Sequence, residues 1–280
     1  MHLIPSSVPA AARIVANWRR YRLRRKVRAE LGQTLSRFAD LSLQLAPALK
    51  AGAYTGVLWD DTAGRFLGLA YHELAALVAD ENGKPIPFGV GVLAGEEEVG
   101  NGTRKRSFED VARDVDAVSE KLGPKVLVVT DQMNTGGALR RIVSGLQARQ
   151  KKYDLLIDGP SLSRDDMKKH PKLIQPGVTH YRPASNEGSE PWGAAHLTAA
   201  RGVDIDLTGP KATRGFRIEF PRVIARNQPF LAEEARRQVS VIVGALHQQI
   251  FHQGEQNPRK IADTAAAALN IPVRRSGLRK

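Results

Sequence analysis

The sequence of 280 residues contains no cysteine. A disulfide framework, a thiolate zinc site and a cysteine nucleophile are therefore excluded. No stretch approaches the roughly 18 uncharged apolar residues that a membrane span needs. The opening segment "MHLIPSSVPAAARIV" is broken by prolines and lacks the apolar core of a signal peptide. We therefore expect a cytoplasmic protein without a transmembrane segment. An Arg-rich, acid-free transit peptide stays open as the alternative for the N-terminal region.

Common nucleotide and metal motifs are also missing. Neither a Walker loop nor a GxGxxG fingerprint is present. His170, His180 and His196 are spaced too irregularly to predict a metal site. The segment "HQQIFHQ", which contains His247 and His252, is interpreted as the polar end of a helix.

Positive charge is abundant and unevenly distributed. The net charge is +13, and eight basic residues with no acid lie between Arg13 and Arg28. The apolar spacing of Ile14, Trp18 and Tyr21 predicts a helix over residues 9–31. Three interpretations stay open: a solvated face packed on the domain, an arm that binds RNA or DNA, and a helix on an anionic membrane surface.

Strand-like and helix-like segments alternate from residue 53 onward, after a second helix over 35–49 that we expect to be interrupted at Pro47. Ser107, with Asp110 three residues later, resembles a capping box at a helix start. "AGEEEVGNGTRKR", residues 94–106, has no apolar anchor and is expected to be a mobile loop. The expected strands are 53–59, 84–93, 125–129 and 153–158, the helices 65–82, 108–122 and 139–150, and weaker strand candidates 203–207 and 216–220.

This alternation predicts an α/β fold, with a mostly parallel sheet flanked by helices. We expect three parts: a basic helical extension over 1–49, the α/β domain over 50–227, and a helical region with a basic tail over 228–280. The last part should contain helices over 230–251 and near 258–269. Ligands of such sheets bind at the carboxyl ends of the strands.

The stretch "KVLVVTDQMNTGGALRRIV", Lys125 to Val143, has the pattern of a phosphate site at such a strand end. A loop that follows a buried strand and opens a helix exposes backbone N–H groups, and the helix dipole adds about half a positive charge there. Gly136 and Gly137 let the backbone close around an anion, while Asn134 and Thr135 offer side-chain donors. Asp131 suits ribose hydroxyls or a divalent cation instead.

The same stretch resembles the phosphoribosyl pyrophosphate signature of the type I phosphoribosyltransferases, and the resemblance covers roughly residues 50–160. It implies that Asp131 contacts the ribose and its Mg²⁺, and that the loop through Thr135, Gly136 and Gly137 binds the 5′-phosphate. Three positions depart from the family pattern. Thr130 replaces the first acid, and Asn134 and Ala138 replace hydroxyl residues, so ligand binding is better supported than catalysis.

Two neighbouring segments extend the resemblance. "DDTAG" after the first strand is similar to the family's pyrophosphate loop, which implies that Asp61, Thr62, Gly64 and Arg65 bind the diphosphate. Residues 94–106 fall where the family has its flexible hood loop. That position implies that Arg104, Lys105 and Arg106 clamp the leaving pyrophosphate. Because Glu96 to Glu98 lie in the same segment, a solvated loop of mixed charge is the alternative.

The leading hypothesis is a phosphoribosyltransferase-like protein that binds phosphoribosyl pyrophosphate or a related nucleotide with Mg²⁺. If active, it would be a transferase of the glycosyltransferase class, with Asp131, Arg65 and Lys105 in catalytic roles. The alternative is a non-catalytic regulator, or a nucleic-acid-binding protein that reuses this fold and contacts RNA or DNA through Arg13–Arg28. The acceptor of the ribose is not specified by the sequence, and a homo-oligomer stays open.

Overall fold

The computed structural model describes residues 35–60, 65–99, 102–130, 136–158, 173, 175–183, 204–205, 216–217 and 228–269. The helix expected over residues 9–31 lies outside this described part. The elements are α2 (Leu35–Lys50), β1 (Gly56–Asp60), α3 (Arg65–Glu81), β2 (Phe88–Val92), β3 (Glu96–Val99), β4 (Gly102–Lys105), α4 (Phe108–Leu122), β5 (Lys125–Thr130), α5 (Gly137–Ala148), β6 (Lys152–Ile157), β7 (His180–Tyr181), β8 (Asp204–Ile205), β9 (Phe216–Arg217), α8 (Gln228–His247), the π-helix η2 (Gln248–His252) and α9 (Pro258–Ala268).

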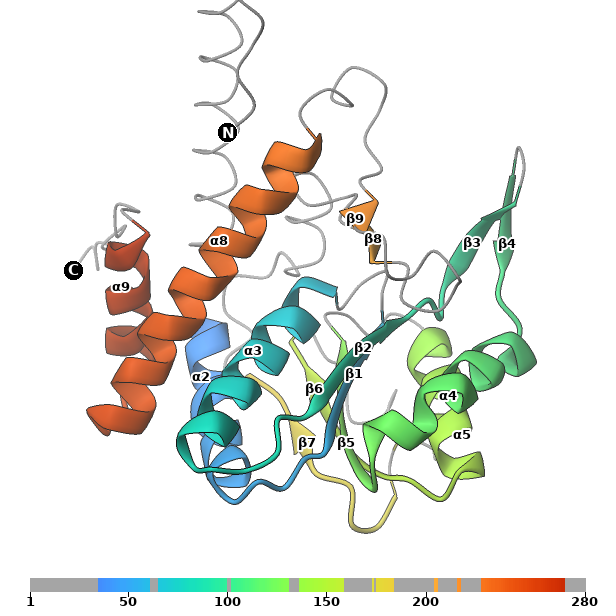
Figure 1. The fold of residues 1–280 in the computed structure, drawn as a ribbon, viewed down its shortest axis with the longest axis horizontal. Helices are drawn as coiled ribbons and strands as arrows, with labels where there is room; N and C mark the ends of the chain where they lie inside the picture. Colours follow the sequence, from blue (N-terminus) through green and yellow to red (C-terminus); the bar gives the residue numbers. More distant parts are fainter. Residues whose placement is uncertain are drawn as a thin grey trace, which may run out of the picture.

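The centre of the fold is a five-stranded sheet in the order β2-β1-β5-β6-β7, in which every neighbouring pair is parallel (Figure 1). The helices α3, α4 and α5 lie between consecutive strands in the chain. This arrangement confirms the expected α/β architecture with a parallel sheet flanked by helices. Strands β1 and β5 are adjacent although a helix, a strand, a hairpin and another helix separate them in the chain.

Successive side chains of a strand point to opposite faces of the sheet, so the strands contribute to two apolar cores, one on each face. On the first face, Trp59, Val129 and Leu156 pack with residues of α2, α3, α8 and α9. On the second face, Leu58 and Val128 pack with residues of α4 and α5. The strands are therefore apolar on both sides, as expected of a parallel sheet covered by helices.

Helix α2 is continuous, so the expected interruption at Pro47 is wrong. Pro47 lies in the last turn of the helix, where the missing N–H costs one hydrogen bond and little of the helix follows. The Ala51 N–H donates to the Pro47 carbonyl at 3.0 Å, which continues the helical pattern past the proline. The buried Leu41, Leu45 and Leu49 hold this helix against the first core.

The segment 94–106 contains an antiparallel hairpin of β3 and β4, not the irregular loop that the sequence predicted. Its register places Glu96 opposite Lys105 and Glu97 opposite Arg104. The two strands thus pair in register over four positions, although the segment has few apolar residues. The hairpin extends away from the sheet next to α4 (Figure 1).

The predicted capping box is confirmed at the start of α4. The Asp110 N–H donates to the Ser107 hydroxyl at 3.0 Å, and the Ser107 N–H donates to the Asp110 carboxylate at 3.2 Å. These two bonds satisfy backbone donors that the helix leaves unpaired at its start.

The C-terminal region is helical, as expected, and packs on α2 and α3 through Val239, Ile242, Leu246 and Ile250. Helix α9 is capped by the Asn257 side chain. The two weaker strand candidates contain the short antiparallel pair β8–β9. Among the described residues, no helix has both the length and the apolar character needed to cross a bilayer.

A close helix–strand contact generates a stability prediction. A Cβ added at Gly68 of α3 would lie 2.3 Å from the Trp59 ring, whereas a Cβ at Gly244 of α8 would meet nothing within 4 Å. We expect Gly68→Ala to lower the free energy of unfolding by about 1–3 kcal/mol, because an overpacked core must shift. Gly244→Ala, the matched control, should raise it by up to about 1 kcal/mol, because alanine favours the helix. Denaturant titration of both variants measures this difference, and equal effects would contradict the packing described.

Candidate functional site

Three buried polar residues lie side by side at the carboxyl edge of the sheet. Asp60 ends β1, Thr130 ends β5, and Asp158 follows β6; they are 4%, 2% and 1% exposed. Trp59 and Val129, the residues directly before Asp60 and Thr130, are paired across β1 and β5. The Asp158 N–H donates to the Thr130 carbonyl at 3.1 Å. Buried polar side chains are uncommon unless they are structurally or functionally required. This edge is therefore the candidate site.

The three side chains divide between the faces of the sheet by strand alternation. Asp60 and Thr130 come two positions after Leu58 and Val128 and therefore point to the same face, which packs with α4 and α5. Asp158 comes two positions after Leu156 and therefore points to the opposite face, which packs with α2 and α3. The edge consequently offers polar groups on both faces.

The predicted phosphate loop begins at this edge and ends at α5. Asp131, Asn134 and Thr135 lie outside the described residues. Gly136 is the N-cap of α5 and has φ 64° and ψ 8°, the left-handed conformation that glycine adopts without strain. Glycine has no side chain that could accept a hydrogen bond from the helix N–H groups, and Gly137 is the first helical residue. The early N–H groups of α5 are thus not capped by that residue.

The predicted pyrophosphate loop follows β1, the neighbour of β5. Asp61, Thr62 and Gly64 lie outside the described residues, and Arg65 begins α3 without a described side chain. Because β1 and β5 are adjacent and parallel, the two predicted loops leave the sheet from the same edge. The structure thus brings the attachment points of both loops together.

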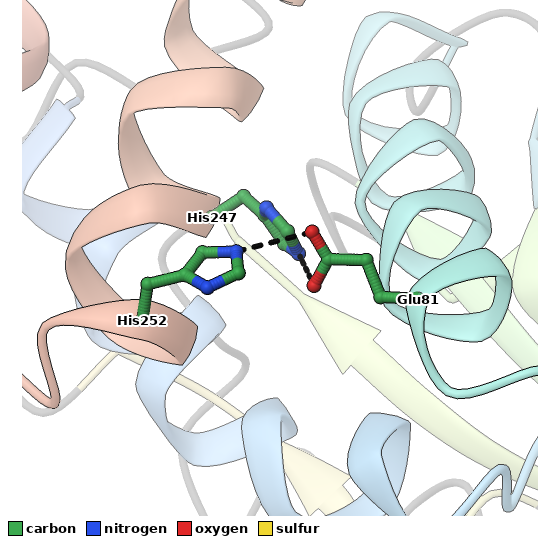
Figure 2. A group of neighbouring side chains, drawn as sticks. All are labelled: Glu81, His247 and His252. Carbon is green, nitrogen blue, oxygen red and sulfur yellow. Dashed lines mark hydrogen bonds and ion pairs between the residues drawn. The ribbon is translucent and has the colours of Figure 1, made fainter.

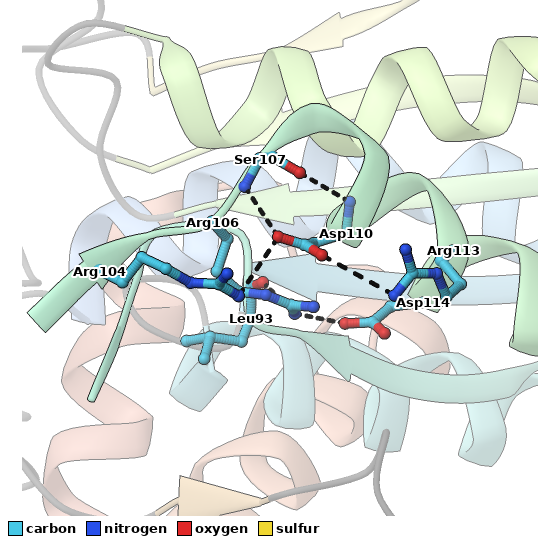
Figure 3. A network of polar contacts seen from close by, with 7 residues as sticks. All are labelled: Leu93, Arg104, Arg106, Ser107, Asp110, Arg113 and Asp114. Atoms are coloured by element: carbon cyan, nitrogen blue, oxygen red, sulfur yellow. Dashed lines mark hydrogen bonds and ion pairs between the residues drawn. The ribbon is translucent and has the colours of Figure 1, made fainter. Parts of the chain in front are cut away.

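The basic residues of the hairpin have different surroundings (Figure 3). Arg106 donates to the Leu93 carbonyl at 2.9 Å and pairs with Asp114, so it holds the hairpin to α4. Arg104 is more exposed and lies 3.4 Å from an Asp110 carboxylate oxygen. Lys105 is exposed on β4. Arg106 is therefore a structural residue in this arrangement, and Lys105 keeps the exposure that a clamp needs.

Sequence reasoning missed Asp158 and its partner Arg37. The Arg37 Nε atom lies 3.7 Å from an Asp158 carboxylate oxygen, and neither oxygen has a hydrogen-bond partner among the described residues. Burial raises the pKa of Asp158 to about 6, against the opposing effect of the Arg37 guanidinium. The local signal was an acid directly after the buried strand "YDLLI". The partner 121 positions earlier could not be inferred from spacing.

Asp154 lies on β6, the strand that Asp158 follows, and its pKa is shifted in the opposite direction. Burial acts to raise its pKa, but the Thr179 N–H, the Lys125 ammonium and the Tyr54 hydroxyl together hold it below the ordinary value. These groups lie 2.8, 2.9 and 2.8 Å from its oxygens. Asp154 is thus a satisfied structural acid, whereas Asp158 is a buried acid whose guanidinium partner is poorly aligned.

No family model, no curated protein and no solved structure matches the chain, so these comparisons assign it to no family.

The contrast between the two acids is testable by their asparagine variants. Folded Asp158 binds its proton more tightly than the unfolded chain does, so its contribution to stability falls as the pH rises from about 4 to above 6. At pH 8, Asp158→Asn should raise the free energy of unfolding by on the order of 1–3 kcal/mol. Asp154→Asn should lower it by about 1.5–3 kcal/mol, because charge-assisted hydrogen bonds are removed.

Urea titrations at pH 5 and pH 8 measure both effects. The gain from Asp158→Asn should shrink at pH 5, where the native carboxyl is largely protonated. The destabilisation by Asp154→Asn should persist at both values, because the lowered pKa keeps this acid ionised until more acidic pH. Destabilisation of the same size in both variants at pH 8 would contradict the account of Asp158.

Proposed function

We propose that the chain binds phosphoribosyl pyrophosphate or a related nucleotide at the carboxyl edge between β1 and β5. One observation carries this proposal. Helix α5 follows β5 directly in the chain and starts after Gly136, a left-handed glycine whose lack of a side chain leaves the first N–H groups without a cap from this residue. Such helix N–H groups and the positive end of the helix dipole suit a phosphate. The order of residue types in 126–138 supports a sugar phosphate in particular.

The residues at this edge fit Mg²⁺ by their chemistry. Mg²⁺ prefers oxygen ligands, commonly one or two carboxylates together with phosphate oxygens of the substrate. Asp131 directly follows β5, and Asp60 ends the neighbouring strand as a buried carboxylate. Asp131 would hold the ion with the diphosphate of the ligand, and the ion would offset negative charge there.

The transfer that these groups suit is displacement at C1 of the ribose. The bond between C1 and the pyrophosphate oxygen breaks with its electron pair leaving on pyrophosphate, and a nucleophile forms the new bond to C1. Asp131 orients the ribose hydroxyls, and Gly136 and Gly137 hold the 5′-phosphate. Arg65 and Lys105 neutralise the departing pyrophosphate, which develops charge as the bond breaks.

Two glycines with the same backbone conformation provide a matched test. Gly136 has φ 64°, and Gly83, which follows α3, has φ 61° with open space around it. Alanine at either position should cost about 1 kcal/mol of stability through left-handed strain. Only Gly136→Ala should weaken phosphoribosyl pyrophosphate binding, by at least about tenfold, because its methyl group stands where the backbone meets the phosphate. Calorimetry with Mg²⁺ measures both affinities.

Asp131→Asn provides the second arm of this experiment and should abolish binding, because the ribose and its cation lose their carboxylate. Unchanged affinity in Asp131→Asn, or an equal loss in the Gly83 and Gly136 variants, would remove the assignment.

A second candidate function rests on the charge distribution. Eight basic residues without an acid occupy Arg13–Arg28, and Thr130 replaces the first acid of the resembled signature. Together they favour a nucleic-acid-binding protein that keeps the ligand site without full catalytic chemistry. Each phosphate that a basic side chain neutralises releases counterions, so binding of this kind weakens steeply with salt.

The corresponding prediction concerns the salt dependence of RNA and DNA binding. Replacing Arg19, Arg20, Arg24 and Arg25 by glutamine should reduce the slope of log affinity against log salt by about 0.7–0.9 for each phosphate that is no longer neutralised. The control removes four exposed basic residues elsewhere and should leave the slope unchanged: Arg113, Lys121, Arg149 and Lys152. Fluorescence anisotropy at several salt concentrations measures the slopes. Identical slopes in both variants would contradict nucleic-acid binding through Arg13–Arg28.

A further inference from the structure

Three side chains from distant parts of the chain converge at the end of α3 (Figure 2). Glu81 is the last residue of α3, His247 ends α8, and His252 ends the π-helix η2. Nε2 of His247 lies 3.2 Å from one Glu81 carboxylate oxygen, and Nε2 of His252 lies 3.0 Å from the other. One ligand atom from each residue falls within 4.8 Å of the other two.

The π-helix is what brings the two histidines together. In a regular α-helix of 3.6 residues per turn, side chains five positions apart point about 140° away from one another. The wider turn of Gln248–His252 forms i to i+5 hydrogen bonds, such as the Gln253 N–H to the Gln248 carbonyl at 3.1 Å. It thereby directs His247 and His252 to the same carboxylate. Single π-turns inside helices occur frequently at functional sites.

His247 is held in place but poorly satisfied. It is 6% exposed, its ring stacks on Phe251 with centroids 5.3 Å apart, and it meets the His252 ring edge-on at 5.0 Å. Its Nε2 atom faces Glu81 without forming a well-aligned hydrogen bond. The Nε2 atom of His247 thus lies beside a carboxylate and a second imidazole, the arrangement of donor atoms from which a shared metal ion could be bound.

We propose that Glu81, His247 and His252 bind one divalent transition-metal ion, for which Zn²⁺ is the appropriate probe. Zinc takes imidazole nitrogens at about 2.0–2.1 Å and carboxylate oxygens at about 2.0–2.2 Å, and its tetrahedral geometry places two such ligand atoms about 3.4 Å apart. The ligand atoms here lie within 4.8 Å of one another, so the most widely separated pair must approach by up to about 1.4 Å. Rotation of Glu81 and His252, which are 44% and 45% exposed at their side chains, can supply it.

The donor set also selects the class of ion. Two imidazoles favour zinc, copper, nickel or iron, whereas magnesium and calcium prefer oxygen ligands alone. Three protein ligands leave a coordination position free, and the exposure of Glu81 and His252 makes it accessible to water or a small ligand. This site is separate from the proposed Mg²⁺ position, which depends on Asp60 at the end of β1 and on Asp131, which follows β5.

A bound ion would join α3 to the C-terminal helices. Glu81 belongs to the helix that follows β1, while both histidines belong to the α8–η2 segment. Binding of the ion to the folded chain alone would stabilise that chain by mass action. Zinc should therefore raise the melting temperature as well as bind.

The test is a calorimetric titration of the metal-free full chain with Zn²⁺, paired with thermal melts. The wild type should bind one ion at this site and melt at a higher temperature with zinc. Glu81→Gln and His252→Ala, which change partly exposed side chains, should each weaken binding at least about tenfold, the range seen when metal ligands or their supports are removed. Both should abolish the zinc-dependent rise in melting temperature.

Two controls separate this site from other histidines and acids. Glu120→Gln changes an exposed acid on α4, and His72→Ala removes a described histidine that is not in the cluster; both should keep wild-type zinc binding. Melts without zinc show whether each variant is folded. Absence of zinc binding by the wild type, or unchanged binding in both Glu81→Gln and His252→Ala, would overturn the proposal. The Gly136→Ala variant should retain zinc binding, so failure of the nucleotide site is distinguishable.

Discussion

The parallel pairing of β1 with β5 is the constraint on which the proposed site depends. From β1 the chain passes through α3 to β2 on one side, whereas β5, β6 and β7 extend the sheet on the other. The strand order thus reverses between β1 and β5. In open α/β sheets, ligands bind at such a reversal, outside the carboxyl ends of the strands. Asp60 and Thr130 mark this position, and α5 begins beside it.

Packing on both faces of the sheet keeps that edge in place. Each central strand is apolar toward two layers of helices, so a shift of register would move buried side chains into the wrong core. Among the buried polar residues of the central strands, Asp60, Thr130 and Asp158 lie at the carboxyl ends and Asp154 lies within a strand. Asp154 is satisfied by three partners, while Asp158 faces a distant guanidinium at 3.7 Å. A poorly satisfied buried acid at a strand end is typical of a place where stability has been exchanged for function.

Local patterns predicted much of the fold. The capping box at Ser107 and Asp110, the buried strand before Thr130 and the amphipathic stretch over 108–122 depend on neighbours within a few residues. The hairpin over 96–105 was missed because its strands lack the apolar alternation by which strands are recognised in a sequence. The continuity of α2 through Pro47 depends on how close that proline lies to the helix end.

The polar clusters were less accessible to sequence reasoning, because they join residues that are far apart in the chain. Arg37 meets Asp158 across the first core, and Glu81 meets His252 across 171 positions. His247 and His252 were interpreted as part of a polar helix end, because nothing in the sequence indicates the π-helix that brings them together. Glycine at 136 was the most informative local signal, and its left-handed conformation agrees with the proposed phosphate turn.

Hydrogen–deuterium exchange with and without phosphoribosyl pyrophosphate and Mg²⁺ tests the central proposal most directly. Bound phosphate should slow exchange of the amides over residues 131–140 and, through the diphosphate, over residues 61–66. Amides of α9, which packs on α2 in the first core and contributes no residue to the proposed site, should keep their rates. Unchanged exchange over 131–140 at saturating ligand, or protection confined to another part of the chain, would contradict the account.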